Sequence, residues 1–135
     1  MDESLVQKVW RRARDTCEYC HISQTLYPAP FQIDHIIAQQ HGGPTVLSNL
    51  ALSCLYCNSH KGPNIAGLDP MTGKLTKLFN PRTQKWLRHF RWQGPFLIGR
   101  TPIGRVTIAV LGINDPYPLA LRSVLAEEGR LRGRK

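Results

Sequence analysis

Two Cys-x-x-Cys pairs constrain the folding of this chain more than any other feature. Cys17 and Cys20 form the first pair, and Cys54 and Cys57 form the second. A gap of two residues lets both sulfurs of a pair turn toward one ion, and two pairs complete the tetrahedral thiolate shell of a structural Zn²⁺ site. The sequence therefore predicts a zinc site that ties two distant segments together. A redox role is the alternative, but redox pairs usually occur singly in a βαβ setting.

The length and composition fit one domain. With 135 residues, of which 41% are hydrophobic, the chain can bury one modest core. The first four residues are mostly polar or acidic, and no apolar run approaches the roughly 18 residues of a membrane span. We therefore expect neither export nor membrane insertion. Paired cysteines without an export signal favour a reducing compartment, which we take to be the cytoplasm.

The positive charge is concentrated in the second part of the chain. Residues 1–60 carry 4 Lys and Arg against 5 Asp and Glu, whereas residues 61–135 carry 14 against 4. A basic region of this kind is typical of a polyanion partner, because neutralised phosphates release counterions. The alternative is a solvated basic face that serves solubility. The charge therefore favours a nucleic-acid partner without proving one.

The first half predicts a helix followed by a strand, loop, strand and helix. Ser4-x-x-Gln7 resembles a capping box, and apolar residues at helical spacing predict a helix from Ser4 to Asp15. Its cationic face is either solvated or in contact with phosphates. The remaining elements are, in order, a strand over Phe31–Ile37, an irregular loop over 38–48, a strand over Leu50–Ser53, and a helix over Leu55–Lys61 that ends at Gly62-Pro63.

The second half predicts turns, short strands and a final helix. Turn signals at 69–73 and 80–83 separate the predicted strands, which are Lys74–Phe79, Lys85–Trp92, Phe96–Gly99 and Arg105–Leu111. Asn114 or Asp115 can cap a helix that stops at Gly129, and we expect a mobile tail after it. The predicted fold class is α+β in a single domain, with a core motif over about 15–64, a basic strand-rich extension over about 65–112 and a C-terminal helix over about 115–129.

Further residues surround the cysteine pairs in a specific order. They are Asp34-His35-Ile36, Gly42-Gly43, Ser48-Asn49-Leu50 and, after Cys57, Asn58-x-x-Lys61-Gly62. In this combination the chain resembles the HNH endonuclease family, also called the ββα-metal or His-Me finger nucleases, in the subgroup with a four-cysteine zinc site. The resemblance implies a ββα-metal motif and a metal-dependent cut in DNA that leaves 5′-phosphate and 3′-hydroxyl ends. RNA as the substrate stays open.

The resemblance also implies roles for individual residues. Asp34 and Asn58 would hold one Mg²⁺ or Mn²⁺, His35 would be the general base, and Asn49 would orient His35. These roles make physical sense, because carboxylate and amide oxygens suit hard cations and a neutral imidazole can take a proton from water. Zn²⁺ would be structural.

Two geometric arguments test these roles. Adjacent strand residues face opposite sides, so Asp34 and His35 can serve one phosphate only if the strand ends or bends between them. We therefore expect irregular backbone at that point. On the following helix, His60 lies about 200° from Asn58, so the two should not ligate the same ion. His60 is the alternative ligand, because imidazole is a frequent one.

Other residues are candidates for contact with nucleic acid. They are Lys61, His41, Lys85, Arg88 and Arg91. The aromatic residues Trp86, Phe90 and Trp92 alternate with cations and could stack on bases, but the core side of a strand is the favoured interpretation. His21 could replace a thiolate as a zinc ligand, although four sulfurs already fill the shell.

Two hypotheses of different classes follow. The first is a metal-dependent endonuclease that nicks DNA or cuts both strands, and the second is a zinc-stabilised nucleic-acid-binding module without catalysis. The presence of Asp34, His35, Asn49 and Asn58 together favours the first. The sequence leaves the oligomeric state open.

Overall fold

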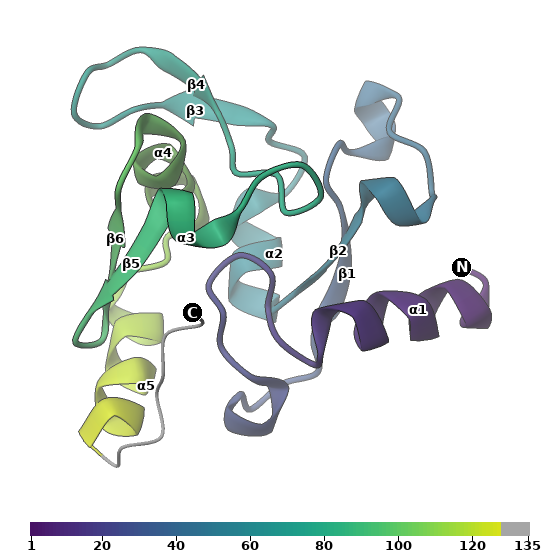
Figure 1. The fold of residues 1–135 in the computed structure, drawn as a ribbon, viewed down its shortest axis with the longest axis horizontal. Coiled ribbons are helices and arrows are strands. Elements are labelled where there is room, and N and C mark those ends of the chain that lie inside the picture. The colour runs from purple at the N-terminus through teal and green to yellow at the C-terminus, as the bar shows by residue number, and fades with distance from the viewer. Residues whose placement is uncertain (128–135) are drawn as a thin grey trace.

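The computed structural model describes residues 1–127 as helices and three antiparallel strand pairs (Figure 1). The helices are α1 (Glu3–Ala13), α2 (Leu55–Lys61), α3 (Trp86–His89), α4 (Pro102–Leu111) and α5 (Pro116–Glu127). The strands are β1 (Gln32–His35), β2 (Leu50–Ser53), β3 (Ala66–Leu68), β4 (Leu75–Lys77), β5 (Phe90–Gln93) and β6 (Phe96–Gly99). The predicted α+β class is therefore confirmed. Over residues 1–127, no helix combines the length and the apolar character needed to cross a membrane.

The first strand pair and the helix after it form the predicted ββα unit. β1 pairs antiparallel with β2 in a register that sets Asp34 opposite Ala51. β2 and α2 have the bounds predicted from the sequence, and α2 ends at Gly62, which has a positive φ of 50°. The intervening loop contains two 3₁₀ turns, Gln39–His41 and Leu47–Asn49. This unit places Asp34 and His35 on β1 and Asn58 on α2.

The N-terminal helix begins one residue earlier than predicted. Asp2 is its N-cap, and the Asp2 carboxylate accepts a hydrogen bond from the Ser4 backbone, so Ser4 lies inside the helix. The helix ends where Arg14 adopts a left-handed conformation. Arg12 on the outer face is not simply solvated, because its guanidinium donates to the carbonyls of Leu47 and Leu50 at 2.9 and 2.6 Å. Arg12 therefore holds the loop before β2.

The segment Arg105–Leu111 is helical, and its prediction as a strand was wrong. Thr101 caps α4 by accepting a hydrogen bond from the Gly104 backbone, and Pro102 occupies the first turn. Gly104 packs so closely on the preceding helix that a Cβ atom there would lie 2.1 Å from the His89 carbonyl oxygen. β6 therefore pairs with β5 and not with this segment. Capping and close packing thus outweigh the strand preference of the β-branched residues in this segment.

The segment Lys85–Trp92 is likewise only half a strand. Its first part forms the short helix α3, and its second part forms β5. β4 is shorter than predicted and pairs with β3, which was not predicted. Asp115, one of the two predicted caps, directly precedes α5, and its carbonyl accepts from the Leu119 amide at 3.0 Å. Its carboxylate accepts from Tyr56, whereas the Asn114 side chain bonds to Leu97. The predicted stop at Gly129 and the predicted mobile tail lie outside the described residues.

One cluster of buried apolar side chains joins the two halves of the chain. It contains residues of α1, the ββα unit, the β5–β6 hairpin, α4 and α5, including Val9, Leu52, Leu97, Val106 and Leu125. The four cysteines lie within the same cluster. Trp86 and Phe90 are also buried in it, with ring centroids 5.2 Å apart. The core interpretation of these two aromatic residues is therefore correct.

Candidate functional site

The four cysteines converge on one point. The Sγ atoms of Cys17, Cys20, Cys54 and Cys57 all lie within 4.8 Å of one another, and those of Cys20 and Cys54 are 3.9 Å apart. Four sulfurs placed tetrahedrally about 2.3 Å from a Zn²⁺ ion would be about 3.8 Å apart. All four residues are buried. The predicted clustering is confirmed, and its size and donor set fit a zinc ion.

The local backbone prepares each pair to hold a cation. The amide of Cys20 points at Cys17 Sγ at 3.5 Å, and the amide of Cys57 points at Cys54 Sγ at 3.4 Å. Cys54 is also the N-cap of α2, so its sulfur lies at the positive end of the helix. Amide hydrogens and the helix dipole both stabilise a thiolate over a thiol.

The thiols interact strongly with one another. Burial alone would raise the pKa of Cys17, but hydrogen bonds from the other three thiols lower its pKa well below the usual value. The hydrogen bond to Cys17 in turn raises the pKa of Cys57. A cation that binds all four sulfurs as thiolates must displace the protons of the thiols.

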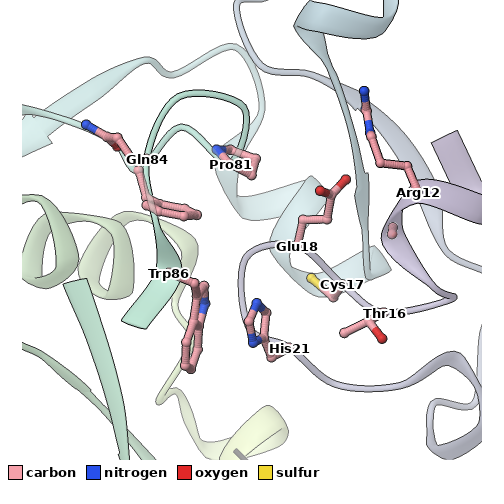
Figure 2. Close-up of a pocket in the computed structure, with 10 residues that line it drawn as sticks. Arg12, Thr16, Cys17, Glu18, His21, Pro81, Gln84 and Trp86 are labelled. Atoms are coloured by element: carbon pink, nitrogen blue, oxygen red, sulfur yellow. The ribbon is translucent and has the colours of Figure 1, made fainter. Parts of the chain in front are cut away.

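His21 is not part of the cysteine cluster. Its ring stacks on Trp86 with centroids 3.8 Å apart, in a pocket of about 150 Å³ that Figure 2 shows beside Cys17. Arg12 and Glu18 line the same pocket, and Glu18 forms an ion pair with Arg82. The alternative in which His21 replaces a thiolate is therefore not supported by the geometry.

Asp34 is almost fully buried between two donors. It is 4% exposed, and its Oδ2 accepts a hydrogen bond of 2.6 Å from the Tyr19 hydroxyl. Its Oδ1 accepts from Lys61 Nζ at 3.2 Å. Burial raises the pKa of Asp34, although the charge of Lys61 opposes this shift. Burial and the Asp34 charge also raise the pKa of Tyr19, which keeps its hydroxyl a donor.

Lys61 faces the interior, and the prediction that it contacts nucleic acid is wrong. Its side chain is 1% exposed, and Nζ also donates to the carbonyls of His35 and Ile36 at 3.1 Å each. Three acceptors thus satisfy the ammonium group. The signal that could have indicated this was the spacing, because Lys61 lies four residues after the buried zinc-site residue Cys57 on the same helix face.

His35 ends a regular strand. β1 keeps its antiparallel pairing through both Asp34 and His35, so the irregular backbone expected between them is absent. His35 is half-buried, and its Nε2 lies 2.8 Å from Thr45 Oγ1. Gln39 donates to the same oxygen at 3.3 Å. Within residues 1–127 the other ring nitrogen, Nδ1, has no hydrogen-bond partner. Sequence analysis missed Thr45, which no motif marks.

Asn49 holds the loop that follows His35 rather than the His35 ring. Its Oδ1 accepts from the Ile37 amide at 3.0 Å, and its Nδ2 donates to the carbonyls of Ile37 and Pro44 at 3.0 and 2.9 Å. Gly43 fits beneath these bonds because a Cβ there would lie 1.7 Å from the Ile37 carbonyl oxygen. Asn49 and Gly43 thus fix the loop that carries Thr45.

A surface hollow of about 220 Å³ brings three predicted site residues together. Its lining includes Asp34, His35 and Asn58, together with Ile33, Ala38, Gln39, Gly62 and Pro63. Asp34, Asn58 and His35 thus border one space. The side chains of Asp34 and His35 leave opposite faces of β1, yet both residues line the hollow.

The other candidate residues lie elsewhere. His60 stacks on Tyr56 with centroids 4.0 Å apart, and its Nδ1 lies 2.9 Å from the Tyr56 carbonyl oxygen, so it does not line the hollow. His41 is exposed in the 3₁₀ turn that also contains Gln39, a residue of the hollow. The remaining candidates, Lys85, Arg88 and Arg91, are exposed on the segment of α3 and β5.

The fold and site together define a ββα unit joined to a cluster of four cysteines that could hold a metal ion. Residues 17–64, which contain all of these features, match the family model described as HNH endonuclease. This match confirms the resemblance expected from the sequence. Members of this family generally bind nucleic acid, and the match indicates a nuclease or a nucleic-acid-binding module. No curated protein and no solved structure matches the chain.

Proposed function

We propose that the chain is a metal-dependent endonuclease that hydrolyses phosphodiester bonds in DNA. The observation that carries the proposal is the single hollow lined by Asp34, His35 and Asn58, within the segment that matches the HNH endonuclease family. The excess of Lys and Arg after residue 60 supports a polyanionic substrate. Candidate backbone contacts are His41, Lys85, Arg88 and Arg91.

Two kinds of metal ion fit the two donor sets. The four thiolates would hold Zn²⁺ as a structural ion, since they leave no open position for substrate. The carboxylate of Asp34 and the amide oxygen of Asn58 are hard donors that fit Mg²⁺ or Mn²⁺. That ion would supply positive charge next to the scissile phosphate when bound. Lys61 already pairs with Asp34, so we expect the hollow to hold the divalent ion weakly.

His35 is the proposed general base. A hydroxyl oxygen has two acceptor lone pairs, so Thr45 Oγ1 can accept from both Gln39 and His35 Nε2. With its proton on Nε2, the His35 ring carries a free lone pair on Nδ1. That lone pair can take the proton from the attacking water. The proposed reaction uses this tautomer, in which His35 donates to Thr45.

The second candidate function is a nucleic-acid-binding module without catalysis. A specific observation favours it: both oxygens of Asp34 already accept hydrogen bonds from buried donors, Tyr19 and Lys61. A carboxylate whose two oxygens are hydrogen-bonded in this way can have a purely structural role. A carboxylate has further lone pairs, however, and Asp34 still borders the hollow.

A supercoiled plasmid separates the two candidates. We expect zinc-loaded wild-type protein to convert it to nicked circles with Mg²⁺ or Mn²⁺ and to leave it intact with chelator. His35→Ala should abolish the conversion, while Gln7→Ala, a change at an exposed residue of α1 outside the hollow, is the control for purity and folding. Linear product appearing with the nicked circles would indicate a cut in both strands. Intact plasmid under every metal condition, with folded protein that still binds DNA, would establish the binding module.

A further inference from the structure

Arg122 on α5 is the largest fully buried side chain in the described part of the chain. It is 1% exposed. Its Nε donates to the Pro95 carbonyl and its Nη2 donates to Asn114 Oδ1, both at 2.8 Å, and the guanidinium lies 5.5 Å from the centre of the Trp92 ring. These partners orient the group, but none of them carries a negative charge.

Arg122 has no carboxylate partner, unlike the cations that form ion pairs in the described part of the chain. Within residues 1–127 the ion pairs are Lys61 with Asp34, Arg82 with Glu18 and Arg105 with Asp69, and no carboxylate lies within ion-pair distance of Arg122. A fully buried charge without a compensating charge is strongly unfavourable. The fold therefore needs a negative charge near Arg122 from some other source.

The cysteine cluster borders the same space as Arg122. Arg122 lines the same small internal space as Cys20, Cys54 and Cys57. Burial lowers the pKa of the guanidinium, and the charge of these three cysteines opposes that shift. A Zn²⁺ ion with four thiolates carries two net negative charges, so the metal-loaded cluster is an anion.

We propose that Arg122 is the counter-charge of the metal-loaded cysteine cluster, so that metal binding and the packing of α5 against the ββα unit stabilise each other. The proposal rests on the zinc site of the proposed function and is independent of nuclease activity. Because coupling is reciprocal, a change at Arg122 must weaken metal binding, and removal of the metal must loosen α5.

The test compares Arg122→Lys, which keeps the charge, with Arg122→Gln, which keeps polarity but removes the charge. Zinc affinity is measured on the full chain by competition with a chromophoric chelator at fixed pH, without nucleic acid. Outer-shell changes typically cost about 10- to 100-fold in metal affinity, and we expect a loss of this size for Arg122→Gln. Arg122→Lys should retain most of the affinity. Arg100→Gln, at an exposed arginine, is the matched control.

A second measurement excludes a purely structural role. We expect Arg122→Gln to lower the urea stability of the zinc-loaded protein more than that of the metal-free protein. Equal zinc affinity for Arg122→Gln and Arg122→Lys, or equal destabilisation of both forms, would overturn the proposal. If Arg122→Gln does not fold even with zinc, the rate of zinc release from Arg122→Lys decides: a rate close to those of wild type and Arg100→Lys supports the proposal, because the charge is kept while the geometry of the guanidinium is lost, and a strongly raised rate overturns it. Wild-type protein that binds no zinc would overturn the zinc site itself.

Discussion

Lys61 Nζ lies 3.2 Å from Asp34 Oδ1, in an ion pair that is almost fully removed from solvent. The pair joins the last turn of α2 to β1, the two elements that border the hollow. Through two further bonds to backbone carbonyls, Lys61 also holds the chain directly after His35. Lys61, which was predicted to contact nucleic acid, is therefore a buried residue that holds β1 and the residues after it in place.

Replacement of Lys61 by Met should strongly destabilise the protein. It leaves Asp34 buried without its counter-charge, and breaking a buried pair in this way typically costs about 3–5 kcal/mol. Urea unfolding of zinc-loaded protein measures the free energy of unfolding. Lys77→Met, at an exposed lysine on β4, is the control. Equal stabilities of the two variants would show that the Lys61 pair contributes nothing to the fold.

Replacement of Thr45 by Val should slow cleavage without unfolding the protein. Valine keeps the shape of threonine but removes the oxygen that contacts His35, and loss of orientation typically costs about 10- to 100-fold. Plasmid nicking should show the loss in kcat, with KM and zinc content unchanged. Thr25→Val, at an exposed threonine, controls for the substitution. If Thr45→Val cleaves at the wild-type rate, Thr45 has no role in orienting His35.

Asn58 and His60 can be separated by matched substitutions. Asn58→Ala removes a proposed ligand and should lower nicking at least about 100-fold, with partial recovery at high Mn²⁺ concentration. His60→Ala should retain activity close to wild type, because His60 stacks on Tyr56 outside the hollow. The reverse pattern would establish His60 as the ligand.

Removal of zinc should unfold the ββα unit. We expect metal analysis to find about one tightly bound zinc per chain, and a chelator should lower the Tm and the far-ultraviolet circular dichroism signal together. Cys17→Ser should behave like the chelated protein, whereas Ser23→Ala, an exchange outside the cluster, should not. A folded preparation without metal would contradict the structural zinc site.

The ion pair between Asp69 and Arg105 should make stability depend on pH in acid. Arg105 donates two hydrogen bonds to Asp69, at 2.9 and 2.8 Å, and these bonds lower the pKa of Asp69 well below its usual value. Because the folded pKa is depressed, the stabilisation is present above the unfolded pKa of about 3.9 and is lost as the pH falls below it.

Asp69→Asn tests this directly. The difference in unfolding free energy between wild type and Asp69→Asn should be constant near neutral pH and should shrink as the pH falls from about 5 toward 3. Measuring the difference at each pH cancels the losses that both proteins share, including protonation of the cysteines. A difference that stays constant over this range would contradict the assignment.

Local sequence patterns predicted the parts of the fold that depend on local chemistry. The cysteine spacing predicted the cluster, and the apolar run from Leu50 with Gly62 as a stop predicted β2 and α2. Arg105–Leu111 was predicted as a strand, and the Thr101-Pro102 helix cap before it was not recognised. In the structure that cap prevails, and the helix packs its Val106 and Leu111 into the core.

The site was predictable in its residue types and less so in its geometry. Motif order identified Asp34, His35 and Asn58, which line one hollow. The partners that hold them, Tyr19, Thr45 and Lys61, come from segments whose approach is decided by tertiary packing. For Lys61 the local signal was its position one helical turn after Cys57, whereas no local pattern marks Tyr19 or Thr45 as a partner.

The hydroxyl of Tyr19 links the cysteine cluster to the hollow. Tyr19 lies between the first two cysteines and holds Asp34 directly. The first cysteine pair and the carboxylate that borders the hollow are therefore tied through a single side chain, so that the position of one depends on the position of the other.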